Sequence, residues 1–404
     1  MGRLRYRLRQ ELFATPADGL LSLGLITLLL VGGTKLLQWM LQQAQWAVIQ
    51  ANSTLLAVGR YPQTEQWRLW LLLLLLAAAT GATWGLLRAH PRHDRAGQLW
   101  PRNDRLASGL LAVLALLSPW ALQLSVAIQM RWWAIGTVLL LSRWLAGRFG
   151  ATLPARFKQL FPLVWPLLYL IGLGLIGGGL GLISVPPSEW GGLLLTLLVS
   201  SFAILLCFPI GVLLALGRRS ELPLLRWGSI MYIEFIRGAP LITLLFLGQN
   251  ILGFLLPGGI APDRVWRAAW VLTFFAAAYL AEAVRSGLAA IPPGQLEAAR
   301  SLGLNYPQAL RTVVMPQALR VALPSMVGQF ISLLQDTTLL SLIGLLDLLG
   351  VARAVMANPQ YLGRNAEVYL ILALLFWCAC AALGLGSRAL EKRLDPRSLP
   401  MKQN

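Results

Sequence analysis

The feature that most constrains this chain is a run of apolar residues that recurs along its length. A helix rises 1.5 Å per residue, so about 17 to 25 apolar residues cross the hydrocarbon core of a bilayer. Such runs predict about ten spans in the 404-residue chain, near 19–40, 67–87, 106–122, 132–147, 160–182, 190–216, 238–256, 266–286, 322–345 and 367–387. The expected fold class is therefore all-α, a polytopic integral membrane protein.

The placement of charge gives the orientation of these spans. The net charge is +18, a surplus that also occurs in nucleic-acid-binding proteins. When the segments between successive spans are assigned alternately to the two sides of the membrane, one side holds 26 of the 34 Lys and Arg residues. The other side, taken as the outside, holds only eight: Lys35, Arg60, Arg68, Arg131, Arg264, Arg267, Arg353 and Arg364. Basic residues concentrate on the cytoplasmic side of helical membrane proteins. We therefore expect both termini in the cytoplasm and no nucleic-acid partner.

Two further expectations come from the same map. The run at 132–147 is short and contains Arg143, but an odd number of crossings must separate the basic loop 88–105 from the outer segment before Trp190. The basic start of the chain leads directly into the apolar run from Gly19 and lacks a small-residue cleavage site, so it indicates an uncleaved anchor.

Several patterns that elsewhere mark catalytic or cofactor sites lie in the wrong context. Gly172, Gly174 and Gly177 match G-x-G-x-x-G, but they lie inside an apolar segment with no strand before them, so helix packing is the better interpretation. His90 and His93 stand in a basic loop and indicate solvated residues, and the three Cys lie in apolar stretches. No P-loop motif occurs. We expect no catalytic residues, no metal and no cofactor bound by this chain.

The most informative segment is the polar stretch 291–320 between two predicted spans. Its residues predict a helix from Gln295 to Leu302 that ends at Gly303, and a second helix that starts at Asn305 and ends near Pro316. A short helix and turn of this kind would project from the membrane. Small side chains at Ala298 and Ala299 let a partner approach closely, and Glu297 can pair with a basic residue of that partner.

This segment resembles the EAA loop of ABC importer permeases. That pattern reads E-A-A, three residues, G, nine residues, I-x-L-P, and here the matching residues are Glu297, Ala298, Ala299, Gly303, Val313, Met315 and Pro316. The departures, Val for Ile and Met for Leu, are conservative.

Further motifs in the same order resemble the polar amino acid branch of that family. Glu234 to Pro240 is similar to E-x-x-R-G-T-P and includes Arg237, and the segment from Tyr279 through Glu282 and Arg285 is similar to Y-x-A-E-x-x-R-x-G. Gln335, Asp336, Thr337, Thr338 and Leu339 resemble K-D-T-[ST]-L, with Gln335 where the family often has Lys. The N-terminal extension resembles that of the general L-amino-acid type of permease.

The resemblance implies an architecture and a set of partners. It divides the chain into an N-terminal extension of about five spans, 1–188, and a five-span permease core, 189–404, that carries the EAA loop. It implies a bacterial inner-membrane importer of polar or general L-amino acids. The implied partners are a second homologous permease, two cytoplasmic ATPases that bind ATP and Mg, and an extracytoplasmic binding protein that delivers the amino acid.

Charged residues inside predicted spans are the candidate pathway and gate residues, because a carboxylate in the bilayer is normally paired or faces a polar cavity. Asp336, with Gln335, Thr337 and Thr338, is expected either to face the pathway or to clamp helices by hydrogen bonds. Glu282 and Arg285, three residues apart, are expected to pair near the cytoplasmic gate, in the region of Glu234 and Arg237.

Two other classes of function remain as alternatives. A secondary, ion-coupled amino acid transporter would need coupling-ion acids, whereas only Asp336 lies deep in a span, and it would not need the EAA loop. A membrane-embedded enzyme would need a cluster of nucleophile, base or metal ligands, and the sequence offers none. The identity of the transported amino acids and the role of the N-terminal spans stay open at this level.

Overall fold

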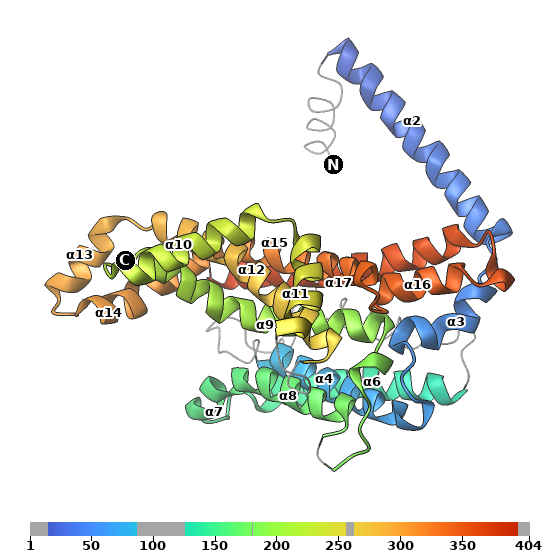
Figure 1. The fold of residues 1–404 in the computed structure, drawn as a ribbon, viewed down its shortest axis with the longest axis horizontal. Coiled ribbons are helices and arrows are strands. Elements are labelled where there is room, and N and C mark those ends of the chain that lie inside the picture. The colour runs from blue at the N-terminus through green and yellow to red at the C-terminus, as the bar shows by residue number, and fades with distance from the viewer. Residues whose placement is uncertain (1–14, 87–125, 180, 256–261, 395–404) are drawn as a thin grey trace. The chain divides into compact units, whose positions relative to one another are not determined.

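The computed structural model describes residues 15–86, 126–179, 181–255 and 262–394. The described chain is built from α-helices with only isolated β-bridges between segments. In chain order the α-helices are α2 Pro16–Gln38, α3 Ala47–Val58, α4 Gln66–Leu86, α6 Val126–Phe149, α7 Ala155–Leu160, α8 Val164–Gly177, α9 Gly192–Arg218, α10 Pro223–Gly238, α11 Leu241–Leu255, α12 Arg264–Ala289, α13 Pro293–Ser301, α14 Tyr306–Ala309, α15 Met315–Asp336, α16 Leu348–Met356 and α17 Asn365–Leu394 (Figure 1).

Seven helical segments of the described chain are long and apolar enough to cross a membrane, and a bent pair makes an eighth. They match the predicted spans that start near residues 19, 67, 160, 190, 238, 266, 322 and 367. The predicted span 106–122 lies outside the described residues. The predicted span 132–147 is a helix, α6, but it is not among the apolar spans that meet this length and hydropathy test. The prediction of an all-α polytopic membrane protein is confirmed.

Two predicted spans are preceded by helical structure that was not predicted. The span predicted at 238–256 is α11, and an unpredicted helix, α10, precedes it at an angle of 107°. The break falls at Ala239 and Pro240, where proline supplies no N–H to continue the helix. The span predicted at 322–345 begins much earlier, because helical structure runs without a break from Tyr306 to Ile343, over 38 residues.

The chain divides into two compact units. The first holds residues 1–54 and 352–379, and the second holds residues 55–351 and 380–404. In the first unit, Thr15 and Asp18 form a capping box at the start of α2. The Glu367 carboxylate, which is buried, accepts the amide N–H of Gln45.

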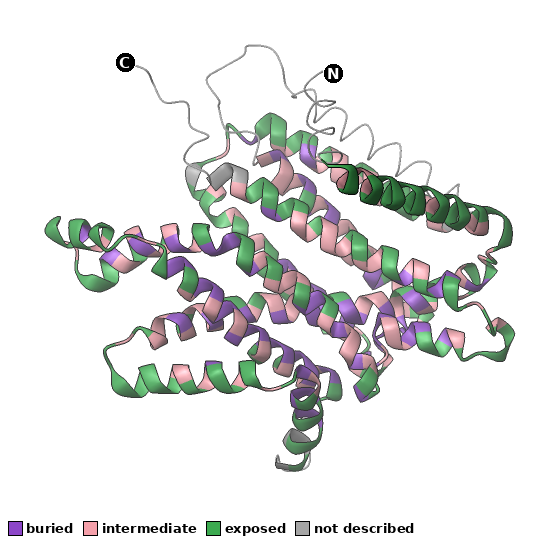
Figure 2. Cartoon of the chain, turned by 90° about the horizontal axis from the view of Figure 1, so that it is seen from above, coloured by how far each residue is buried: buried purple, intermediate pink, exposed green. Residues whose placement is uncertain are grey.

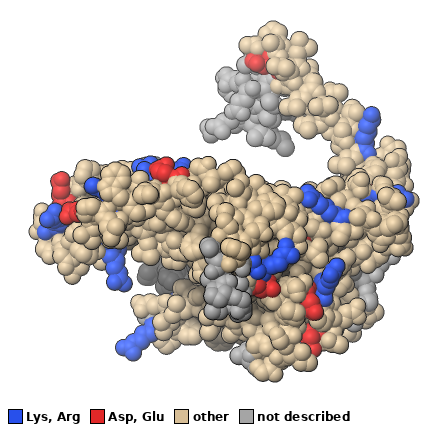
Figure 3. Space-filling model, viewed as in Figure 1, with Lys and Arg blue, Asp and Glu red and all other residues tan. Residues whose placement is uncertain are grey.

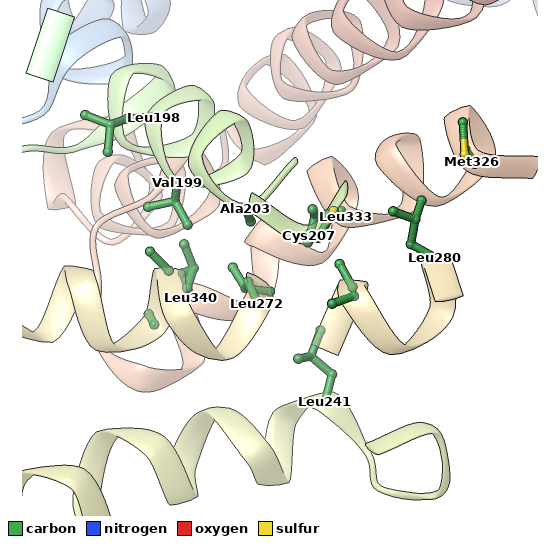
Figure 4. Close-up of a cluster of buried hydrophobic side chains, with 14 of the residues drawn as sticks. Leu198, Val199, Ala203, Cys207, Leu241, Leu272, Leu280, Met326, Leu333 and Leu340 are labelled. Atoms are coloured by element: carbon green, nitrogen blue, oxygen red, sulfur yellow. The ribbon is translucent and has the colours of Figure 1, made fainter. Parts of the chain in front are cut away.

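The core of the second unit lies between α9, α12 and α15. Leu198, Val199, Ala203 and Cys207 of α9 belong to one apolar cluster with Leu272 and Leu280 of α12 and Leu333 of α15 (Figure 4). Many of the contact positions are alanine or glycine, which lets the helix backbones approach closely. A Cβ on Gly287 of α12, for example, would lie less than 3.0 Å from the Ala318 carbonyl oxygen of α15. Buried residues follow the facing sides of these helices (Figure 2).

Helices α4, α6 and α8 of the N-terminal extension also belong to the second unit. Gly81 and Gly85 of α4 lie against the backbone of α6, and Arg143 of α6 stacks at 3.7 Å over the Trp84 ring. The stack explains how a buried arginine is accommodated in α6. In α8, Gly172 packs on Leu72, as expected for a packing glycine, whereas Gly178 lies past the helix end in a left-handed conformation.

Candidate functional site

The predicted EAA loop is a short helix followed by a sharp turn. Helix α13 runs from Pro293 to Ser301, close to the predicted limits, and Gly303 follows it with a φ of 83°. The N–H of Gly303 bonds to the Arg300 carbonyl at 2.9 Å, and that of Leu304 bonds to the Ala299 carbonyl at 3.3 Å. This left-handed helix end favours glycine because a Cβ is strained there.

The loop presents a mixed polar and apolar tip. Glu297 and Ala298 are exposed, as a docking residue must be, whereas Ala299 is only 3% exposed and packs inside the loop. The tip also exposes Leu302, at 84%, and Tyr306, two residues that the motif comparison did not single out. Figure 1 shows α13 and α14 projecting beyond the ends of α9 and α12, and Figure 3 shows acidic and basic side chains gathered at that end.

The second half of the loop is the start of a long helix. Asn305 caps it as predicted, since its side chain accepts the Gln308 N–H at 3.0 Å and the Gln308 side chain accepts the Asn305 N–H at 3.1 Å. The predicted end near Pro316 is wrong. A π-helical turn, Leu310–Val314, widens the helix just before the proline, so α14 continues directly into α15.

Contacts within the second unit hold the loop to the spans. Ala309 is fully buried, and Gln317 of α15 donates a hydrogen bond to Gln295 of α13 at 3.2 Å. The loop and α15 are therefore joined both along the backbone and through side chains. Displacement of the loop tip would be transmitted along α15.

The far end of this helical segment carries the predicted pathway residues. Helix α15 ends at Asp336 and tightens into a 3₁₀ helix, Thr337–Ile343. Gln335 is exposed, and Asp336 and Thr338 are half-buried, but Thr337 is fully buried and its hydroxyl donates to the Leu334 carbonyl. The Thr338 hydroxyl donates to the Gln335 carbonyl.

Asp336 carries a half-buried carboxylate at the end of α15. Within the described residues, no hydrogen-bond donor or basic side chain contacts its carboxylate, because both neighbouring threonines turn back to the helix backbone. A half-buried carboxylate without a partner attracts a cationic or hydrogen-bonding group.

A charge cluster joins three helices. Glu282 of α12 accepts the Arg285 Nε–H at 2.8 Å, and its other oxygen lies 3.5 Å from Arg218 of α9 and 3.8 Å from Arg237 of α10. Arg218 also pairs with Glu234 at 3.0 Å. The predicted Glu282–Arg285 pair is confirmed, and Glu234 and Arg237 lie beside it.

Sequence reasoning missed the residue that links this cluster. In the charge map Arg218 counts only among the 26 basic residues assigned to the cytoplasmic side. It lies 64 residues before Glu282 in the sequence, so only the packing of α9 against α12 reveals the contact. Its signal in the sequence is a charge at the last turn of a span, which by itself indicates only topology.

The described residues contain no group of three or more His, Cys, Asp or Glu side chains placed to hold a metal ion. His90 and His93 lie outside the described residues. The helices define a polytopic membrane protein, with α13 and α14 projecting at one end and Asp336 at the end of α15.

Comparison with known proteins gives the family. A family described as binding-protein-dependent transport system inner membrane component matches residues 207–396. The chain is 35% identical over 397 residues to the inner membrane amino-acid ABC transporter permease protein YhdY of Escherichia coli (strain K12), covering 97% of this chain and 93% of that protein. It is 35% identical over 377 residues to the glutamate/glutamine/aspartate/asparagine transport system permease protein BztC of Rhodobacter capsulatus, covering 87% and 79%.

A shorter relative matches about half of the chain. The probable glutamine ABC transporter permease protein GlnP of Bacillus subtilis is 38% identical over 205 residues, which cover 92% of that protein but 50% of this chain. The chain belongs to the family of binding-protein-dependent transport system inner membrane components, and it is an inner membrane protein. The resemblance drawn from the motifs is confirmed.

Proposed function

We propose that this chain is the permease subunit of an ATP-driven importer of amino acids, polar or general L-amino acids in class. The observation that carries the proposal is the continuous helical segment from Tyr306 to Ile343, which joins the projecting loop to Asp336. A partner that moves the loop would move the wall of the pathway. The relatives, which are permease proteins of amino acid transport systems, support the same function.

The proposed complex contains three further kinds of protein. A second homologous permease completes the pathway, and two cytoplasmic ABC ATPases dock on the loops, with Glu297, Ala298 and Leu302 as contact residues. An extracytoplasmic binding protein delivers the amino acid substrate. ATP and Mg bind on the ATPases, so this chain is a non-catalytic subunit. It lies in the bilayer of a bacterial inner membrane, with both termini in the cytoplasm and no nucleic acid bound.

Asp336 is proposed to face the pathway together with Gln335 and Thr338. Its unpartnered carboxylate can accept the ammonium group that every amino acid carries. Glu282, Arg285, Glu234 and Arg237, joined by Arg218, are proposed to pair α9, α10 and α12 at the inner gate. An arginine cluster around one carboxylate holds three helix ends together and can separate when they move.

Gly303→Asp tests the coupling surface. An aspartate at a φ of 83° strains the turn and displaces the loop tip, while nothing lies within 4 Å of the new Cβ to disturb the spans. Uptake and binding-protein-stimulated ATP hydrolysis of the assembled complex should be abolished, with membrane insertion intact. Gly363→Asp, with the same φ of 83° and equally open space, is the matched control. Normal stimulated ATP hydrolysis in Gly303→Asp would falsify the proposal.

A further inference from the structure

The N-terminal extension meets the permease core in a stack of three backbones. Gly59 follows α3 with a φ of 67° and forms an antiparallel bridge with Trp190, just before α9. A Cβ on Gly59 would lie less than 3.0 Å from the Gly191 backbone. A Cβ on Gly191 would lie 2.9 Å from both Gly59 Cα and the Leu346 carbonyl oxygen. No side chain fits between these segments.

The third backbone of the stack leads from the pathway segment into α16. Gly192 donates its N–H to the Leu346 carbonyl at 2.8 Å, and Leu348 donates its N–H to the Thr196 hydroxyl at 3.0 Å. Asp347 is fully buried and caps α16 through the N–H groups of Leu349 and Gly350. The start of α9 and residues 346–350 are thus joined by hydrogen bonds, and Gly59 packs against the start of α9 at the same place.

Side chains of the extension secure the connection between α8 and α9. The buried Tyr61 hydroxyl donates to the Ile176 carbonyl at 3.0 Å. Arg68, which is 1% exposed and paired with Glu65, donates to the Ile183 carbonyl at 2.8 Å. The Ile176 hydrogen bond is buried and the Ile183 hydrogen bond is part-buried, and both tie main-chain acceptors to side chains of another segment, which gives a fixed connection.

From this stack we infer that the extension has a positioning role in transport: the segment 59–68 is a brace that fixes the outer end of the permease core. It holds the start of α9 and residues 346–350 in one place, so that motion transmitted along α15 ends before Leu346. Gly59, Gly191, Tyr61 and Arg68 are positioning residues, which act through α9 and α16 and need not contact substrate. The inference rests on the proposed function for its transport readout.

Two pairs of glycine substitutions separate the brace from general strain. Gly59→Ala adds a methyl group inside the stack, whereas Gly181→Ala adds one at a φ of 80° with nothing within 4 Å. Gly191→Ala adds a methyl group inside the stack at an extended φ of −163°, and Gly228→Ala adds one in open space on α10. We expect uptake per amount of assembled permease to fall about tenfold or more in the two stack variants, since overpacking forces backbone shifts, and to change little in the two controls.

A distance measurement gives a readout that loss of stability alone would not move. Spin labels are attached to Thr64→Cys, which is exposed, and Leu349→Cys, in a chain with Cys378 and Cys380 replaced by serine. In the complete complex the distance between the labels should be the same without nucleotide and after vanadate trapping with ATP. Gly59→Ala should broaden the distribution of this distance in both states. A change in the label distance between the two states, in the chain without glycine substitutions, would overturn the brace. Wild-type uptake by both Gly59→Ala and Gly191→Ala would also overturn it. Absence of ATP-dependent uptake by the unsubstituted complex would instead count against the proposed function.

Discussion

Replacement of Glu282 by glutamine tests whether the charge cluster holds the helices together. The change removes the negative charge that faces Arg218, Arg237 and Arg285, replaces one acceptor oxygen by an NH2 donor, and keeps the side-chain volume. Glu282 is 23% exposed, and the arginines are 26%, 34% and 39% exposed. Because water screens such partly exposed pairs, each contributes about 0.2–1 kcal/mol, and the three together contribute about 2 kcal/mol. For a chain of this length the corresponding fall in Tm is about 2–3 °C.

The assay is thermal unfolding of the purified permease in detergent at 0.15 M and 1 M salt. The Debye length falls from about 8 Å to about 3 Å between these conditions, so the difference between Glu282→Gln and the parent should shrink at high salt. Glu221→Gln is the matched control, because Glu221 is exposed and the described structure gives it no ion pair; its stability should stay within about 0.5 kcal/mol of the parent. Equal Tm values for the two variants at low salt would refute the reasoning.

Two further substitutions test the pathway and the packing of the spans. Asp336→Asn removes the unpartnered negative charge, so it should lower the rate of amino acid uptake or change the range of amino acids taken up. The amount of permease in the membrane should stay the same. Unchanged uptake of acidic, neutral and basic amino acids alike would contradict this role. Gly287→Ala should destabilise the permease by about 1–3 kcal/mol in thermal unfolding, because the added methyl group meets the α15 backbone, while Gly384→Ala, with open space around it, should not. Equal stability of those two variants would show that α12 and α15 do not pack as described.

The features that sequence predicted well are the ones set by local chemistry. Gly303 and Asn305 mark a helix end and a helix start because a left-handed turn and a capping side chain each need a particular residue type. The apolar runs predicted spans because the bilayer sets a length. In each case the physical requirement lies within a few residues, so the pattern can be recognised without knowledge of the fold.

The features that sequence missed depend on distant contacts or on two competing local rules. Pro316 predicts a helix end, but the preceding π-helical turn accommodates it. The Arg218 contact with Glu282 requires the packing of α9 on α12. Thr337 resembles a pathway residue in the sequence, yet it is buried because the tightening from α15 into a 3₁₀ helix turns its side chain inward.

The segment between Asp336 and Gly344 connects α15, which the proposed motion would displace, to residues 346–348, which are hydrogen-bonded to α9. In the proposed complex an ATPase that moves the EAA loop would move α15, whereas the hydrogen bonds of Gly192 and Thr196 fix residues 346–348 to α9. Any relative motion must therefore be absorbed in between, where the helix is already a 3₁₀ helix, a form frequent at hinges, and where Gly344 has a φ of 79°.

Gly344→Ala tests this hinge. An alanine in the left-handed region destabilises that conformation by about 1–2 kcal/mol, which biases the segment against one of the backbone states that it must adopt. Uptake should fall by about fivefold or more, because each 1.4 kcal/mol shifts a conformational equilibrium about tenfold. Gly363→Ala carries similar backbone strain at a φ of 83° outside the segment and should transport normally; a Cβ on Gly344 additionally lies 3.3 Å from the Arg264 guanidinium, a flexible side-chain end. If the two variants transport at the same rate, the motion is absorbed elsewhere, and the break between α10 and α11 at Pro240 becomes the next place to look for it.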